Sequence, residues 1–224
     1  MKERLVSVLL SLALALFAVS GAIAVPILCR PFYYAHIERL ELSERTGWSE
    51  DVIRGAYDGV MDYMFKGAEF NTGELKWSES GRSHFADVRV LFRLDVALCA
   101  ASAAALIILL LLSRRIKPHR FLRFGPSFWA GAGLLAVFAV IGIAGAADFE
   151  RAFVAFHSLF FPGKTNWVFD PVEDPIIYIL PQTYFRNCAI LAIVMIAVLV
   201  AVYLTAGRRK KKEEARPTAV SASP

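Results

Sequence analysis

The sequence predicts an all-α membrane protein in which four transmembrane helices carry an extracytoplasmic cap formed from the two outer segments of the chain. Hydrophobic residues make up 57% of the 224 residues and charged residues only 20%, which is too apolar for an ordinary soluble domain. Four long stretches contain no Asp, Glu, Lys, Arg or His. Basic residues flank these stretches unevenly, which gives the chain a direction across the bilayer.

The uncharged stretches have the length that a membrane-spanning helix requires. About 20 residues cross a hydrocarbon core of about 30 Å, because an α-helix rises about 1.5 Å per residue. The second stretch is the shortest, and we extend it upstream by placing Arg89, Arg93 and Asp95 at the interface or against protein. One membrane domain, 1–207, then contains spans at about 5–29, 88–113, 124–147 and 187–207.

Basic residues predict that both termini lie in the cytoplasm. The chain start, the segment between the second and third spans and the region after the fourth contain 13 basic and 3 acidic residues, against 12 and 17 elsewhere. The positive-inside rule therefore places the other two segments, 30–87 and 148–186, outside as the cap. Residues 208–224 form a basic cytoplasmic tail whose small polar end predicts disorder. This charge distribution suits membrane lipid as a partner and does not indicate nucleic acid.

The N-terminus also has features of a cleavable signal peptide, which is the alternative for the first span. Met1–Ala24 begins with basic residues and ends in Ala22-Ile23-Ala24. Its apolar body is longer than the usual core of roughly 7 to 15 residues, and its loss would leave an odd number of spans. We therefore favour a retained first span.

The first outer segment predicts an amphipathic helix. Ser49 can cap its start, Glu50 and Asp51 suit the positive end of the helix dipole, and Gly67 can end it. Its apolar residues share one face, which we expect to lie on the membrane surface or on the other cap segment. That face contains Ile53, Tyr57, Val60, Met61 and Met64.

Aromatic residues are concentrated in the outer segments. Of 28 aromatic residues, 21 lie between Phe32 and Phe92 or between Phe149 and Phe185. Interfacial aromatic belts populate both leaflets of a bilayer, so an excess on one side needs another cause. We predict an aromatic-lined chamber between cap and bilayer, suited to a molecule that carries acyl chains.

Sequence motifs give no indication of a metal or cofactor, and we expect none. The run Gly131-Ala132-Gly133-Leu134-Leu135-Ala136 matches a dinucleotide fingerprint, but it lies inside a predicted span, where small residues serve helix contacts. Three cysteines, at positions 29, 99 and 188, follow no metal or redox spacing.

Two of the four histidines have a setting that suits catalysis. His84 precedes the second span and His157 follows the third, so both are expected near the outer interface, beside aromatic residues. A lone histidine in such a place is more often a hydrogen-bonded packing residue, but two at similar depth can share one site. His36 and His119 lie in charged stretches and are expected to be solvated.

The carboxylates near these histidines have structural as well as functional interpretations. Asp87, three residues after His84, can orient a histidine or pair with Arg89. Asp170 and Asp174 each precede a proline and can cap short helices.

Several runs in the outer segments are distinctive enough to suggest a family. They are Ser83-His84-Phe85-Ala86-Asp87-Val88-Arg89, Phe156-His157-Ser158-Leu159-Phe160-Phe161 and Asn166-Trp167-Val168-Phe169-Asp170-Pro171, followed by Asp174-Pro175 and Leu180-Pro181. With these runs the sequence resembles the bacterial lipoprotein intramolecular transacylases, over nearly all of the chain before the tail.

The resemblance implies an acyltransferase of the bacterial cell membrane that acts on a diacylglyceryl-modified lipoprotein. It implies transfer of the sn-2 acyl chain to the α-amino group of the N-terminal Cys, with His84 and His157 as the catalytic residues. Residues that flank His157 in the matched run are expected to contact the substrate. The expected substrate-binding residues are Phe160, Phe161, Asn166, Trp167 and Tyr184. The expected orienting or structural residues are Asp87, Arg89, Asp170 and Asp174.

Two other functions are compatible with the residues. One is a membrane lipid hydrolase or intramembrane protease, with Ser83 or Ser158 as nucleophile or with Asp170 and Asp174 as an aspartyl pair. The other is a non-catalytic membrane protein that binds lipoproteins. The residues indicate neither the oligomeric state nor which histidine acts as the base.

Overall fold

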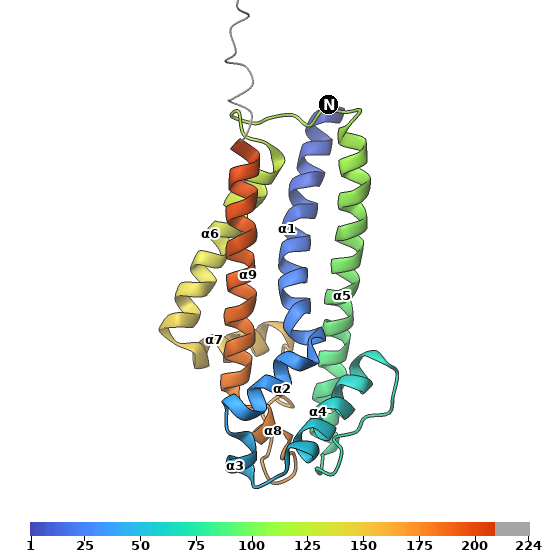
Figure 1. The fold of residues 1–224 in the computed structure, drawn as a ribbon, viewed down its shortest axis with the longest axis vertical. Coiled ribbons are helices and arrows are strands. Elements are labelled where there is room, and N and C mark those ends of the chain that lie inside the picture. Colours follow the sequence, from blue (N-terminus) through green and yellow to red (C-terminus); the bar gives the residue numbers. More distant parts are fainter. Residues whose placement is uncertain (209–224) are drawn as a thin grey trace, which may run out of the picture.

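Four long helices form the body of the molecule, seen in a computed structural model that describes residues 1–208. Each of these helices is long and apolar enough to cross a membrane, which confirms the predicted all-α architecture. They run side by side along the long axis of the molecule (Figure 1). The predicted tail, 208–224, lies outside the described residues except for Arg208. The helices are α1 (Lys2–Leu28), α5 (Glu79–Ser113), α6 (Pro126–Ala147) and α9 (Gln182–Arg208).

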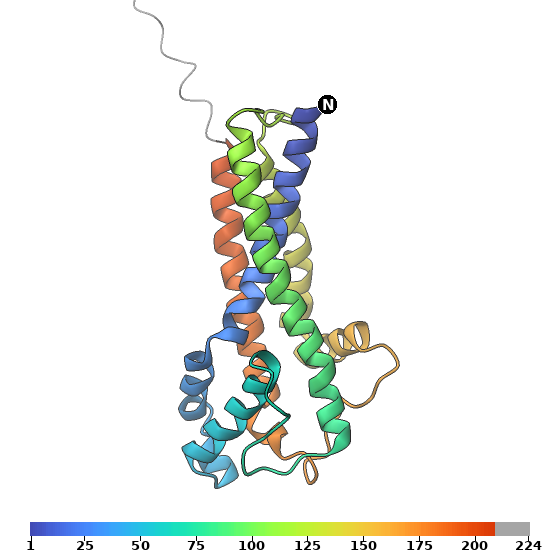
Figure 2. The same ribbon diagram turned by 90° about the vertical axis from the view of Figure 1, so that its right-hand side faces the viewer.

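The shorter helices gather at one end of this bundle, where they form the cap (Figures 1 and 2). The start of α1 and the end of α9 lie together at the opposite end, beside the loop between α5 and α6 (Figure 1). The five cap helices are α2 (Arg30–Arg39), α3 (Leu42–Thr46), α4 (Glu50–Phe65), α7 (Phe149–Phe160) and α8 (Ile176–Ile179). α7 follows α6 after a single residue and projects sideways where the bundle meets the cap (Figure 2).

Two of the long helices extend further into the cap than the sequence predicts. α5 begins at Glu79 rather than at residue 88, and α9 begins at Gln182 rather than at residue 187. At about 1.5 Å per residue, the 35 residues of α5 extend for about 52 Å, whereas the hydrocarbon core is about 30 Å thick. The first turns of α5 therefore belong to the cap, and they give residues 79–87 a rigid helical support.

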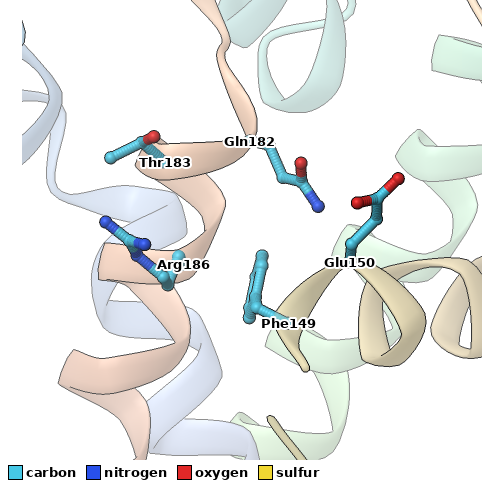
Figure 3. Close-up of a pocket in the computed structure, with 5 residues that line it drawn as sticks. All are labelled: Phe149, Glu150, Gln182, Thr183 and Arg186. Atoms are coloured by element: carbon cyan, nitrogen blue, oxygen red, sulfur yellow. The ribbon is translucent and has the colours of Figure 1, made fainter. Parts of the chain in front are cut away.

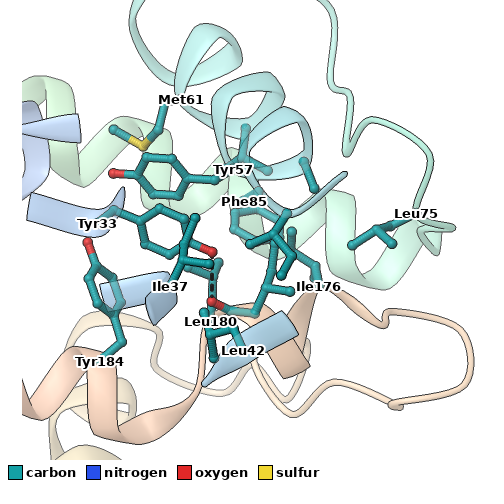
Figure 4. Packing of buried hydrophobic residues seen from close by; sticks show 14 of the residues in the cluster. Tyr33, Ile37, Leu42, Tyr57, Met61, Leu75, Phe85, Ile176, Leu180 and Tyr184 are labelled. Atoms are coloured by element: carbon teal, nitrogen blue, oxygen red, sulfur yellow. Dashed lines mark hydrogen bonds between the residues drawn. The ribbon is translucent and has the colours of Figure 1, made fainter. Parts of the chain in front are cut away.

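Both outer segments contribute to one hydrophobic core inside the cap. The predicted α4 is capped by Ser49, and Gly67 adopts a left-handed conformation just beyond its end. Tyr33 of α2 stacks on Tyr57 of α4 with ring centroids 3.7 Å apart, and its hydroxyl donates to the Ile179 carbonyl at 2.9 Å (Figure 4). The apolar face of α4 is thus buried inside the cap, where it contacts α2, α3 and α5 as well as α8 of the second outer segment. Its buried residues are Ile53, Ala56, Tyr57, Val60, Met61 and Met64.

A buried carboxylate from the second outer segment fixes the start of α5. Asp174 accepts hydrogen bonds from the backbone N–H and the hydroxyl of Ser78, at 2.7 and 2.6 Å. Ser78 in turn caps the helix by accepting from the Gly81 N–H at 3.0 Å. Asp174 therefore serves the start of α5 and does not cap a helix of its own, because α8 starts after Pro175 without a side-chain cap.

Replacing Gly81 by Ala is expected to destabilise the cap. A Cβ atom at this position would overlap Asp174 Oδ1, so the buried carboxylate would have to move away from Ser78. Such a displacement costs about 1–3 kcal/mol of unfolding free energy, which the thermal unfolding midpoint in detergent would report. Gly55→Ala in α4 is the matched control, since a Cβ there meets no atom within 4 Å. Equal midpoints for the two variants would contradict this account of Gly81.

Candidate active site

Two buried histidines, one from each outer segment, meet where the cap joins the bundle. His84 lies in the second turn of α5 and His157 near the end of α7. Only 6% of His84 and 7% of His157 is exposed, and their ring centroids are 6.0 Å apart. The structure thus brings together the two histidines that the sequence singled out.

The hydrogen bond of His157 defines which of its nitrogens is free to act as a base. Nδ1 lies 2.7 Å from the carbonyl oxygen of Phe153, one turn earlier in α7. A carbonyl only accepts, so Nδ1 donates its hydrogen and the neutral ring presents the lone pair of Nε2. Burial lowers the pKa of His157 from its ordinary value, and the bond to Phe153 offsets only part of this effect. The ring is therefore neutral at neutral pH, as a proton acceptor must be.

Aromatic rings enclose both histidines. Phe161 contacts both, with ring centroids 5.0 Å from His84 and 5.7 Å from His157. Trp167 packs against His157 at 4.6 Å, and Phe169 meets His84 nearly edge-on at 5.5 Å. Nδ1 of His84 is buried in this shell and has no hydrogen-bond partner in the described part of the chain. Packing therefore holds His84 in place, and Nδ1 can bond to a bound molecule.

A polar network lies beside the histidine pair. Asp87, one turn after His84, accepts hydrogen bonds from Lys164 Nζ at 2.6 Å and from Asn166 Nδ2 at 3.2 Å. Burial alone would raise the pKa of Asp87, but the bonds from Lys164 and Asn166 outweigh it and hold the pKa below its ordinary value. The suggested pairing of Asp87 with Arg89 is wrong, because the Arg89 guanidinium lies over an aromatic ring of α4, 4.5 Å from its centroid.

Lys164 and Phe169 are residues of this site that the sequence interpretation missed. Lys164 is the only lysine in the second outer segment, and it lies two residues before Asn166. An isolated cation so close to the matched run was a signal that it has a specific partner. Phe169 lies inside the same run, but the sequence does not show whether Trp167 or Phe169 faces His84, which lies 85 positions before Phe169.

Three other residues of the predicted site lie away from the histidine rings. Phe160 is 46% exposed, because helical periodicity places positions 157 and 161 on the inner face of α7 and position 160 on the outer face. Tyr184 is buried in the cap core against α2. Asp170 closes a local turn by accepting a hydrogen bond from the Val172 N–H. Within residues 1–208, Phe161 and Trp167 are the members of the expected aromatic wall that contact the pair.

His36 is buried, although its charged surroundings predicted a solvated residue. It is 3% exposed, and its Nδ1 lies 2.7 Å from the carbonyl oxygen of Phe32. Its ring meets Tyr184 nearly edge-on with centroids 5.5 Å apart. The charges around His36 in the sequence lie on the outer face of α2, while the histidine faces the cap core.

A small cavity opens between α7 and α9, close to the first turn of each helix (Figure 3). Its volume is about 130 Å³, and neither His84 nor His157 lines it. The lining residues are Phe149, Glu150, Gln182, Thr183 and Arg186.

The arrangement suits acid–base chemistry by two neutral imidazoles. His157 can accept a proton at Nε2, and His84 can donate or accept within a few ångströms of the same point. Among residues 1–208, no three His, Cys, Asp or Glu side chains are grouped so that they could hold a metal ion.

Comparison with models of protein families shows to which family the chain belongs. The family model described as lipoprotein intramolecular transacylase Lit matches residues 8–185. The chain belongs to the Lit family. A search of proteins with curated functions finds no significant match.

Solved structures of Lit from Bacillus cereus share this fold. A structure of that membrane-integral protein has a TM-score of 0.83 and 24% sequence identity, covering 92% of this chain and 94% of its own. A variant of it in which a histidine is replaced by alanine has a TM-score of 0.74 and 25% identity, covering 92% of each chain. A histidine-to-arginine variant has a TM-score of 0.76 and 23% identity, covering 92% of this chain and 91% of its own. The Lit architecture therefore extends over nearly the whole chain described here.

Proposed function

We propose that this protein is a lipoprotein intramolecular transacylase. It moves the sn-2 acyl chain of a diacylglyceryl-modified lipoprotein to the α-amino group of the N-terminal Cys and leaves the lyso form. Membership of the Lit family supports this reaction. The observation that carries it is the pair of buried imidazoles, His84 and His157, 6.0 Å apart in an aromatic shell at the base of the cap.

The chemistry needs a proton acceptor more than an enzyme nucleophile. An α-amino group has a pKa of about 7.7 to 8.0, so most of it is protonated at neutral pH and cannot attack an ester. Once the amine is neutral, Nε2 of His157 removes one of its two remaining protons as the amine nitrogen bonds to the sn-2 ester carbonyl carbon. The bond between that carbon and the sn-2 oxygen then breaks, and the proton passes from His157 to this oxygen. An N–H of His84 donates to the oxyanion of the tetrahedral intermediate.

Positioning supplies most of the rate in this proposal. Amine and ester belong to one flexible molecule, and holding them in contact is worth about 7–11 kcal/mol. Acid–base assistance adds only about 10²- to 10⁴-fold. Phe161 and Trp167 touch the histidine rings and form the walls that hold the lipid head in this conformation.

The proposed site lies at lipid-headgroup depth, on the outer side of the membrane. α7 follows α6 after a single residue, and its outward apolar side chains are exposed for contact with lipid. These exposed side chains are Val154, Phe156, Leu159 and Phe160.

Basic residues cluster at the end of the bundle opposite the cap, which supports cytoplasmic termini and an extracytoplasmic cap. A reporter that is active only in the cytoplasm should work when fused after Pro224 and fail in the 69–73 loop; the reverse pattern would overturn this orientation.

The side chains required by a hydrolase or protease have other partners. Ser158 donates to the Val154 carbonyl at 2.9 Å, on the exposed side of α7. Ser83 accepts from Asn166 at 3.4 Å, and Asp174 is occupied by Ser78. Family membership likewise does not favour these functions or a purely binding role.

Mass spectrometry of a lipoprotein tests the proposed function directly. A bacterial host that makes only diacylglyceryl lipoproteins is compared with and without this protein. The N-terminal lipopeptide should keep its total mass while one acyl chain moves from glycerol to nitrogen. Release of free fatty acid, with a corresponding loss of mass, would instead identify a hydrolase.

The pH dependence of the reaction should reflect the lowered pKa of His157. Below the amine pKa of about 7.7 to 8.0, kcat/KM should fall tenfold per pH unit, because the neutral amine becomes scarcer. His157 stays neutral as the pH passes its ordinary value of about 6.5, so the further decline due to its protonation appears only at lower pH. Rates of the purified protein in detergent measure this profile. A second break above about pH 6.5 would contradict the expected direction of the shift.

A further inference from the structure

The side-chain amide of Asn166 is held in one orientation. Its Nδ2 donates to Asp87 Oδ2 at 3.2 Å and to Ser83 Oγ at 3.4 Å. The carboxylate of Asp87 can only accept, and its other oxygen is bound by Lys164 Nζ at 2.6 Å. The nitrogen of Asn166 must therefore face Asp87, and Oδ1 must face the other way.

Oδ1 of Asn166 is buried and has no hydrogen-bond partner in the part of the chain described. Nδ1 of His84 is buried and unpaired in the same site. Folded proteins rarely leave buried polar atoms unsatisfied, and those that occur often belong to binding sites. Asn166 precedes Trp167, whose ring packs on His157, and its own Nδ2 contacts Ser83 and Asp87 in the same turns of α5 as His84.

We propose that Oδ1 of Asn166 accepts a hydrogen bond from the α-amino group of the lipoprotein substrate. This proposal rests on the transacylase function. An amide oxygen needs a donor, and the ester oxygens at the reacting centre only accept, whereas the amine donates. Asn166 thereby selects substrates with a free N-terminal amine, and Asp87 and Lys164 are positioning residues that fix the amide.

A neutral acceptor suits an amine that must become a nucleophile. A carboxylate in direct contact would favour the ammonium form, which has no lone pair for attack. The nearby Asp87 carboxylate is paired with Lys164, so its charge is compensated. Oδ1 of Asn166 can orient the amine without holding its proton, and Nε2 of His157 remains the group that removes it.

Two unreactive substrate analogues test the inference with the purified full-length protein. Both are dialkylglyceryl cysteine peptides whose ether bonds cannot transfer an acyl chain, and one lacks the α-amino group. The unmodified protein should bind the amine analogue about tenfold more tightly than the desamino analogue. Asn166→Ala should abolish most of this preference and keep the affinity for the desamino analogue within about twofold. Thr165→Ala, an exposed neighbour, should keep the preference.

The outcomes separate this inference from the function on which it rests. An unchanged preference in Asn166→Ala, or an equal loss of affinity for both analogues, would overturn the role of Oδ1. Conversion of the ester substrate by the unmodified protein reports the transacylase function independently.

Discussion

Replacement of His157 by Gln is expected to lower the rate of acyl transfer by about 10²- to 10⁴-fold. Glutamine retains a polar side chain that can bond to the Phe153 carbonyl, but it has no basic nitrogen to remove a proton from the amine. The rate should be measured as conversion of a diacylglyceryl peptide by the purified variant. Because the base is lost, any residual rate should follow only the ionisation of the amine.

His36 provides an unusually close control for this substitution. Like His157, it is buried, and its Nδ1 lies 2.7 Å from the carbonyl oxygen of a phenylalanine one helical turn earlier. The ring centroids of His36 and Phe32 are 4.5 Å apart, against 4.2 Å for His157 and Phe153. His36→Gln should therefore cost a similar amount of stability but leave the acid–base chemistry intact. Equal rate losses in the two variants, with equal thermal midpoints, would mean that His157 acts through packing alone.

Local sequence patterns predicted the parts of the fold that local interactions determine. The four membrane-spanning helices follow from long uncharged runs, and the limits of α4 follow from Ser49 and Gly67. The buried face of α4 follows from helical periodicity. Each of these features depends on residues within a few turns, so the sequence contained the information needed.

Tertiary contacts decided the features that the sequence interpretation got wrong. Asp87 had Arg89 two positions away as a possible partner, but the partner in the structure is Lys164, which the folded loop brings to 2.6 Å. His36 is buried because α2 turns one face into the cap core. The predicted topology placed His84 and His157 at similar depth, and resemblance to a family assigned both to catalysis, but no local pattern relates the rings of positions so far apart.

Trp167→Ala is expected to reduce the rate about as severely as loss of a histidine, by about 10²-fold or more. The indole lies 4.6 Å from the His157 ring and is held by a bond from its Nε1 to the Lys164 carbonyl at 3.0 Å. Its removal frees both the imidazole and the lipid head to move, and a displacement of about 1 Å can cost about 10²-fold in rate. Conversion of the diacylglyceryl peptide by the purified variant measures the effect.

The shape of the pH profile distinguishes the loss of Trp167 from the loss of His157. Trp167→Ala keeps the base, so its slower reaction should retain the low-pH break of the unmodified protein, whereas His157→Gln should lack that break. Trp167→Phe should recover much of the rate, because a ring again closes the site. Trp129→Ala, at the far end of the bundle, removes an indole remote from the histidines and should leave the rate unchanged. Full activity of Trp167→Ala would remove the aromatic wall from the mechanism and leave the histidine pair to position the substrate alone.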